Sequence, residues 1–172
     1  MSTNPNPDLM RIFDFTAADL EANRAGRMSE REMQRLQNIS AKQRSIELLA
    51  AVSLPVGMCV FLLFVHPSYG ICLFLLFPLP IALAMLFLIF IKHKKLMSDI
   101  ATQKVEYLEG EVKYWSGRAF YGYMKINGRE FEIDPATNLE LSDFMEHQAK
   151  QLSLRLYFSP TSKKVVSAEI LR

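Results

Sequence analysis

The sequence predicts a membrane protein of mixed α and β structure. We expect an N-terminal helical segment, a two-helix transmembrane hairpin and a small C-terminal five-stranded β-barrel of SH3-like or OB-like type. Two observations carry this prediction. Two long apolar runs without charge, 48–65 and 71–91, are separated only by His66–Gly70, and short alternating strands follow from Lys104 onward.

Composition sets the size of these parts. The chain has 172 residues and a formal net charge of +2, and half of its residues are hydrophobic. The hydrophobic excess is concentrated in the two runs, so only the C-terminal region is long enough to bury a core of its own. The predicted parts are a disordered tail over 1–11, a cytosolic helix–glycine–helix segment over 12–46, the transmembrane hairpin over 47–92 and the barrel domain over 102–172.

The N-terminal segment carries helix start and stop signals. Thr16 can cap a helix with Asp19 three residues later, and Gly26 suits the left-handed conformation that ends one. Ser29 and Glu32 then form a capping-box pattern for a second helix that leads to the membrane. The apolar residues of this segment are too few to form a core. They therefore need the C-terminal domain, lipid or another protein to pack against.

Each apolar run spans about 27–32 Å as a helix, which matches the hydrocarbon core of a bilayer. Cationic residues flank the runs and are absent from the connecting loop, so the positive-inside rule places both termini in the cytosol, most simply at a bacterial cytoplasmic membrane. The residues expected at the membrane interface are Lys42, Arg44, Lys92, Lys94 and Lys95.

Small residues predict how the two membrane helices pack. Ala50, Ser53 and Gly57 form one stripe, and Ala82 and Ala84 lie on the facing run; such stripes allow close helix approach, within one hairpin or between copies. Prolines interrupt both runs near the middle. They are typical of simple kinks in membrane helices, or alternatively of a cavity in a transporter.

The C-terminal pattern predicts the strands of the barrel. Gly110 lies between 105–108 and 111–115, where a glycine can mark a bend, and Asn127-Gly128 is a strong hairpin signal between alternating residues. We expect Met124, Ile126, Phe131 and Ile133 to point inward. A loop over 134–138, a short helix over 142–148 and alternating strands over 152–158 and 165–171 complete the pattern, with Leu152, Leu154, Leu156 and Phe158 on the core face.

Several segments of this region carry a resemblance. Gly110-Glu111-Val112, the hairpin over 125–131, and the run from Leu156-Tyr157-Phe158-Ser159-Pro160 to Glu169 resemble the small cytosolic barrels appended to bacterial membrane proteins. The plan of a membrane segment with a small β-barrel is similar to that of NfeD-like proteins. The resemblance covers about the last seventy residues and implies an accessory or scaffolding role in a membrane, without assigning a role to any residue.

The sequence contains no phosphate-binding, dinucleotide-binding, hydrolase or metalloprotease motif, so we expect no enzyme, no metal and no cofactor. Glutamates along the predicted strands argue against nucleic acid. The residues expected to form a partner surface are Phe13, Phe15, Leu20, Trp115 and Tyr121. The predicted function is a membrane-anchored adaptor or assembly subunit that binds lipid and a protein partner or another copy. The alternatives are a small transporter or channel component, and a regulatory barrel that senses a ligand.

Overall fold

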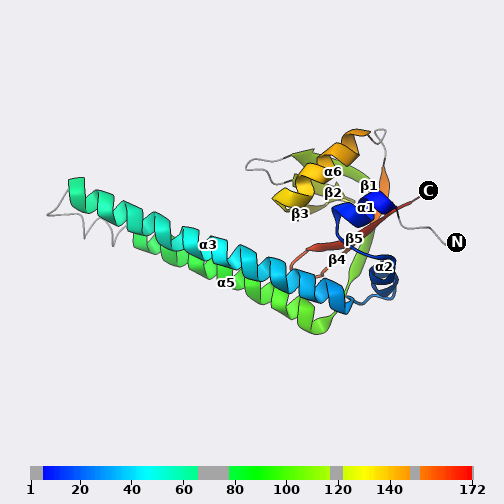
Figure 1. The fold of residues 1–172 in the computed structure, drawn as a ribbon, viewed down its shortest axis with the longest axis horizontal. Coiled ribbons are helices and arrows are strands. Elements are labelled where there is room, and N and C mark those ends of the chain that lie inside the picture. The colour runs from blue at the N-terminus through cyan, green and yellow to red at the C-terminus, as the bar shows by residue number, and fades with distance from the viewer. Residues whose placement is uncertain (1–5, 66–77, 117–121, 148–151, 172) are drawn as a thin grey trace. The chain divides into compact units, whose positions relative to one another are not determined.

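The computed structural model describes residues 6–65, 78–116, 122–147 and 152–171 (Figure 1). The chain divides into two compact units. Unit 1 comprises Met1–Gln34 and Ser98–Arg172, and unit 2 comprises Arg35–Met97. Unit 1 mixes helices with one sheet, whereas the described part of unit 2 is helical.

Unit 1 is built on a five-stranded sheet with the order β3-β2-β1-β4-β5, in which all neighbours are antiparallel. The central strand, β1, is long and pairs with a different neighbour along each half. Its first part, Glu106–Glu111, pairs with β4, and its second part, Val112–Ser116, pairs with β2. Gly110 lies next to this change at a φ of +155°, and β1 runs through it without a shift in its register with β4. The strands are β1 (Glu106–Ser116), β2 (Gly122–Ile126), β3 (Arg129–Ile133), β4 (Ser153–Phe158) and β5 (Val165–Ile170).

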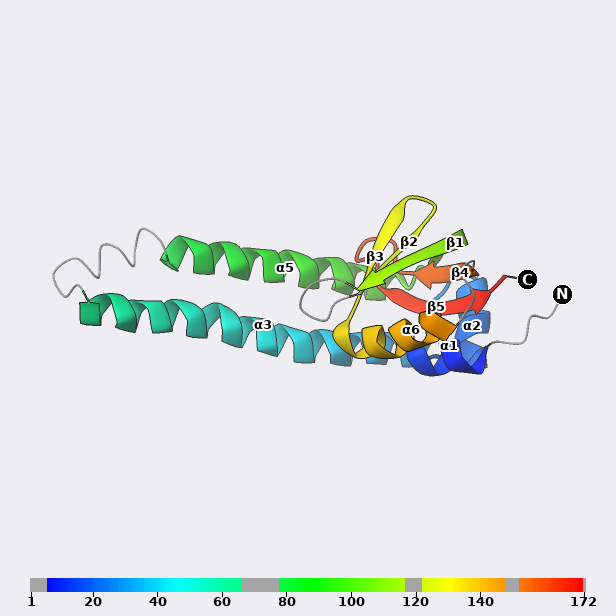
Figure 2. The ribbon, with the colours of Figure 1, turned by 90° about the horizontal axis from the view of Figure 1, so that it is seen from above.

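The predicted β-barrel is wrong, because the sheet is open. Its two outer strands, β3 and β5, each pair with a single neighbour, whereas a barrel would require them to pair with each other. The β5 strand instead contacts the N-terminal helices, and the first of these also contacts α6 (Figure 2). Alternation along a strand specifies which residues are buried, but it does not specify whether the first and last strands meet.

The strand faces follow the prediction. Asn127 and Gly128 both have positive φ and connect β2 to β3 in register, as a two-residue hairpin turn requires. The residues expected to point inward are buried on one face of the sheet. They are Met124, Ile126, Phe131, Ile133, Leu152, Leu154, Leu156 and Phe158.

The helix between β3 and β4 is longer than predicted. This helix, α6, spans Pro135–His147 and includes most of the segment that the sequence predicted as a loop. Asp134 caps it: its carboxylate accepts hydrogen bonds from the Thr137 backbone N–H at 3.2 Å and from the Thr137 hydroxyl at 2.9 Å. A proline directly after such a cap favours a helix start, which is the signal that the prediction overlooked.

The N-terminal part of unit 1 also holds more helix than predicted. The segment Pro7–Ile12 forms α1, although most of it was expected to be a disordered tail. The Asn6 side chain caps this helix by accepting from the Asp8 and Leu9 backbone N–H groups at 2.8 and 3.2 Å. The next helix, α2 (Ala17–Arg24), begins at the predicted capping box of Thr16 with Asp19, and Gly26 has the expected positive φ.

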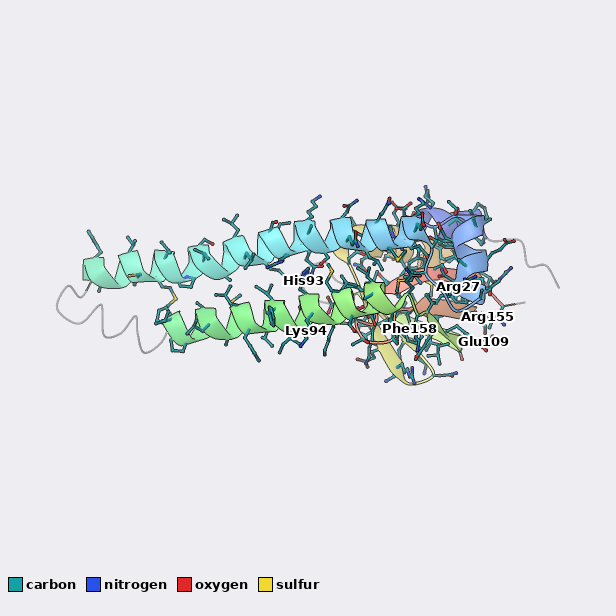
Figure 3. All side chains as sticks on the ribbon, turned by 90° about the horizontal axis from the view of Figure 1, so that it is seen from below. Arg27, His93, Lys94, Glu109, Arg155 and Phe158 are labelled. Atoms are coloured by element: carbon teal, nitrogen blue, oxygen red, sulfur yellow. The ribbon has the colours of Figure 1, made fainter. Side chains whose placement is uncertain are left out.

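Unit 2 consists of two helices that run side by side in opposite directions (Figures 1 and 2). The helix α3 (Glu30–Val65) is continuous from the Ser29–Glu32 capping box through the first apolar run, as predicted. The helix α5 (Pro78–Thr102) holds the end of the second run. A hydrogen bond of 3.1 Å between Ser40 Oγ and His93 Nδ1 joins the two helices (Figure 3).

The prediction of two transmembrane helices is also wrong. Among the described residues, one helix is long and apolar enough to cross a membrane, and it covers Glu30–Phe61 of α3. Part of the second run, 71–77, lies outside the described residues. The described remainder, Pro78–Ile91, is followed at once by Lys92 and is shorter than the roughly 20 apolar residues that a crossing needs.

Candidate functional site

A buried carboxylate joins the N-terminal helices to the sheet in unit 1. Glu169 of β5 is 3% exposed. Its Oε1 accepts hydrogen bonds from Tyr157 Oη at 2.6 Å and from Arg155 Nη1 at 3.0 Å, and its Oε2 accepts one from Arg24 Nη2 of α2 at 2.5 Å. Arg155 also donates to Glu109 of β1 (Figure 3). We call these five residues the Glu169 cluster. Since both carboxylate oxygens of Glu169 are engaged, the cluster fastens α2 to the sheet and is poorly suited to proton transfer.

The Glu169 cluster changes how Tyr157 titrates. Burial raises the pKa of Tyr157, and its hydrogen bond to the Glu169 carboxylate raises it further, against the opposing effect of Arg155. The native state therefore holds this proton more tightly than the unfolded chain does, and it is stabilised as long as the phenol is protonated.

We expect this stabilisation to be lost at alkaline pH. It is fully present below the ordinary tyrosine pKa of about 10, and it falls as the pH rises through the raised pKa of Tyr157. Urea denaturation between pH 8 and pH 11 would measure it. In Tyr157→Phe the free energy of unfolding should fall less steeply with pH over this range than in the wild type. An unchanged slope would contradict the raised pKa of Tyr157.

A second buried group of polar residues connects α2, α3 and β5. Asn23 Nδ2 donates to Glu32 Oε1 and to Ser167 Oγ, both at 2.7 Å, and all three side chains are buried. Nearby, the Asp19 carboxylate accepts from Ser29 and Arg31. Burial by itself would raise the pKa of Asp19, but the hydrogen bonds from Ser29, Thr16 and Arg31 together lower it. These contacts fix the start of α3 in unit 1.

The end of α5 is fastened to unit 1 in a similar way. The Asp99 carboxylate is buried and accepts hydrogen bonds from the backbone N–H groups of Thr161 and Ser162 at 3.0 and 2.6 Å. These two residues belong to the turn between β4 and β5. A buried carboxylate thus orders this turn, because it satisfies backbone donors that would otherwise need water.

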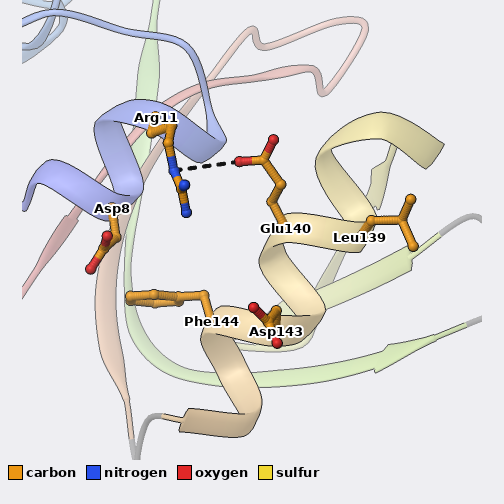
Figure 4. A pocket seen from close by; sticks show the side chains of 6 residues that line it. All are labelled: Asp8, Arg11, Leu139, Glu140, Asp143 and Phe144. Carbon is orange, nitrogen blue, oxygen red and sulfur yellow. Dashed lines mark ion pairs between the residues drawn. The ribbon is translucent and has the colours of Figure 1, made fainter.

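The surface of unit 1 has an open groove of about 710 Å³ between α1 and α6 (Figure 4). Arg11 of α1 approaches Glu140 of α6, with 3.7 Å between Nε and Oε2, and both side chains are exposed. Phe144 extends from α6 toward Asp8 of α1 (Figure 4). The groove is lined by Asp8, Arg11, Leu139, Glu140, Asp143 and Phe144.

The charges and the apolar residues of this groove define what it can bind. Three carboxylates and one guanidinium line it, so its net charge is negative. Leu139 is 68% exposed at its edge, whereas Phe144 is buried. The α1–α6 groove therefore suits a segment with cationic and apolar side chains. Among the residues described, no group of histidine, cysteine and acidic side chains could hold a metal ion.

The residues predicted to form a partner surface do not form one common surface, because some of them are buried. Phe13, Phe15 and Leu20 are buried inside unit 1, because the N-terminal helices pack on its own sheet, which was one of the alternatives that the sequence left open. Trp115 is 40% exposed and stacks on Tyr123 with ring centroids 5.9 Å apart. Tyr121 lies outside the described residues.

The residues predicted for the membrane segment lie in unit 2. The five cationic residues predicted at the interface are all exposed. The predicted packing stripe on α3 is exposed too, since Ala50, Ser53 and Gly57 face outward, whereas Ala51 and Pro55 on the adjacent face are buried. On α5, Ala82 is buried and Ala84 is exposed. A helix face shifts by 100° for each residue, so a stripe chosen by residue size alone can miss the contact face.

The α1–α6 groove and the Glu169 cluster were not predicted. Their members come from segments far apart in the sequence, such as 8–11 and 139–144, and no local pattern connects these segments. One signal was available for the cluster. Arg155, Tyr157 and Glu169 alternate with the predicted core residues of their strands, so they lie together on the opposite face of the sheet. Arg155 and Glu169 are also direct cross-strand partners, and opposite charges at such positions attract each other.

Comparisons with protein-family models, with curated proteins and with solved structures found no match for this chain. The resemblance to NfeD-like proteins stays a prediction from sequence.

Proposed function

We propose that this chain is a membrane-anchored, non-catalytic adaptor whose unit 1 binds a protein partner in the cytosol. The observation that carries the proposal is the α1–α6 groove, which the N-terminal and C-terminal parts of the chain form together. An open groove with a mostly charged lining suits a protein segment better than a small molecule, whose sites are more enclosed and more apolar.

The anchor in this proposal is the apolar part of α3. Its side chains include many large apolar residues that are exposed, and water would solvate them poorly. Both the N-terminal and the C-terminal segments of the chain belong to unit 1. Lys42 and Arg44 precede the apolar part of α3, and by the positive-inside rule we assign unit 1 to the cytosolic side, at a bacterial cytoplasmic membrane. The exposed apolar residues of α3 include Leu49, Val52, Val56, Val60, Phe61 and Phe64.

The partner follows from the chemistry of the groove. We infer a protein segment that carries lysine or arginine beside an apolar side chain, because the groove offers acidic residues around the exposed Leu139. Charged groups at the edge of an interface mainly direct association and select the partner, and apolar anchors provide most of the affinity.

Site-specific photocrosslinking in membranes would test this function. The full-length chain should stay in the membrane fraction after an alkaline carbonate wash. A photoreactive residue at Leu139 should then form one defined crosslinked product, whose mass identifies it as a protein partner or a second copy. The matched control is Tyr107, which is similarly exposed at 62% but lies on β1, away from the groove. It should not form this product.

Charge reversal makes the test specific for the groove. Glu140→Lys combined with Asp143→Lys should reduce the Leu139 product at least fivefold, whereas reversal of the exposed Glu130 and Glu132 of β3 should leave it unchanged. Release of the chain by carbonate would contradict the anchor. An equal yield from Leu139 and Tyr107, or no effect of charge reversal, would contradict the binding site.

A further inference from the structure

Unit 2 has a strong positive charge that the chain as a whole does not show. Within Arg35–Met97 the sequence contains six lysine or arginine residues and one carboxylate, Glu47, although the net charge of the full chain is only +2. The one carboxylate accepts a hydrogen bond from Gln43 of its own helix at 3.0 Å. The charge of unit 2 is therefore not neutralised by acidic residues of its own.

Five of these cations lie at one level of the helix pair. The hydrogen bond between Ser40 of α3 and His93 of α5 sets the two helices in register. The residues Lys42 and Arg44 follow Ser40 on α3, and Lys92, Lys94 and Lys95 flank His93 on α5. Figure 3 labels His93 and Lys94 on this helix. At 1.5 Å per residue, all five lie within about 6 Å of this contact along the helix axes. We call them the cationic belt.

The belt is available for binding. All five side chains are exposed, and none forms an ion pair with the rest of the chain as far as the structure describes it. Large exposed apolar residues begin directly beside it, including Phe90 on α5 and Leu49 on α3. A ring of cations at the edge of an apolar surface matches the boundary of a bilayer, where phosphates lie next to hydrocarbon.

We propose that the cationic belt binds the phosphate groups of anionic phospholipids, so that the anchor prefers membranes rich in such lipids. This inference rests on the membrane anchor proposed above and adds its lipid preference. Each lysine or arginine near an anionic lipid surface strengthens binding about fivefold, and several acting together distinguish anionic from neutral lipid. An acidic protein would satisfy the charges of the belt but not the apolar side chains next to it.

Lipid retention by the intact protein would test the belt. The full-length chain is placed in nanodiscs with equal amounts of phosphatidylglycerol and phosphatidylcholine, and native mass spectrometry then counts the lipids that stay bound. We expect phosphatidylglycerol to be retained about tenfold over phosphatidylcholine. The triple substitution Lys92→Gln, Lys94→Gln and Lys95→Gln should remove most of this preference, because it takes away three of the five cations.

The matched control is Lys104→Gln, Lys113→Gln and Lys163→Gln, which removes the same charge from exposed lysines of unit 1. This variant should keep the wild-type preference. Equal retention of the two lipids, or an equal loss in both triple variants, would overturn the inference. A belt variant that loses a bound acidic protein but keeps its lipid preference would also overturn it. Carbonate release of the wild-type chain overturns the anchor itself, whereas a carbonate-resistant chain without lipid preference overturns only the belt.

Discussion

Replacing Glu169 by alanine is expected to lower the free energy of unfolding of unit 1 by about 3–5 kcal/mol. The substitution removes the carboxylate that Arg24 and Arg155 share, which is also the acceptor of the Tyr157 hydroxyl. Removing one partner of a buried ionic network costs more than the interaction contributes, because the remaining charged groups stay partly desolvated. Arg155 still donates a hydrogen bond to Glu109 in this variant, so the loss of unfolding free energy stays within this range.

Urea denaturation of the full-length chain in a mild detergent would measure this loss. Trp115 is the only tryptophan of the chain and lies in unit 1, so its fluorescence reports the unfolding of that unit. The control is Glu130→Ala, which breaks the ion pair with Lys125. Both side chains of that pair are largely exposed, and we expect a loss of at most about 0.5 kcal/mol. Similar losses in the two variants would show that the Glu169 cluster has no special role.

The substitution Gly122→Ala is expected to be the second most destabilising, at about 1–3 kcal/mol. A Cβ atom at this first residue of β2 would overlap Oδ1 of Asn138 on α6, and it would come within 3.2 Å of the Tyr114 ring. Asn138 cannot easily move away, because it is buried and Tyr114 Oη donates to its Oδ1 at 2.6 Å. The added methyl group therefore pushes α6 away from the sheet.

Two further variants isolate this effect. Gly57→Ala makes the same chemical change where no atom lies within 4 Å of the new Cβ, and it should not destabilise unit 1. Combining Gly122→Ala with Asn138→Ala removes the overlapping side chain. This double variant should be less destabilised than the sum of the two single variants predicts. A strictly additive result, or a neutral Gly122→Ala, would contradict the close packing of α6 on β2.

The parts of the fold that were predicted correctly depend on local physics. The capping boxes at Thr16 and Ser29 and the turn at Asn127-Gly128 are properties of a few adjacent residues. Two helix starts of the same local kind were missed, at Asn6-Pro7 and Asp134-Pro135, because proline was taken as a sign of a tail or a loop. The cap before each proline was the better guide.

The candidate site depends on contacts between distant segments. The α1–α6 groove exists because α1 and α6 pack against each other, and the Glu169 cluster exists because α2 packs against β5. The sequence indicated that Phe13, Phe15 and Leu20 need a surface to pack against, and it left open a protein partner, lipid or the C-terminal domain of the same chain. These residues are buried in unit 1, and no local pattern could select this outcome.

The order of the amino acids alone specifies which segments are apolar, which residues of the predicted strands face the core, where the cations of the helix pair lie and where the hairpin turn forms. These features follow from side-chain period and from backbone preferences, which act over a few residues. Three other features arise from the packing of the folded chain: the sheet stays open, the N-terminal helices contact β5, and an acidic groove forms beside α6. The physical reason is that each of these features is a choice among competing partners for the same apolar or hydrogen-bonding surface. That choice depends on the packing of the whole unit.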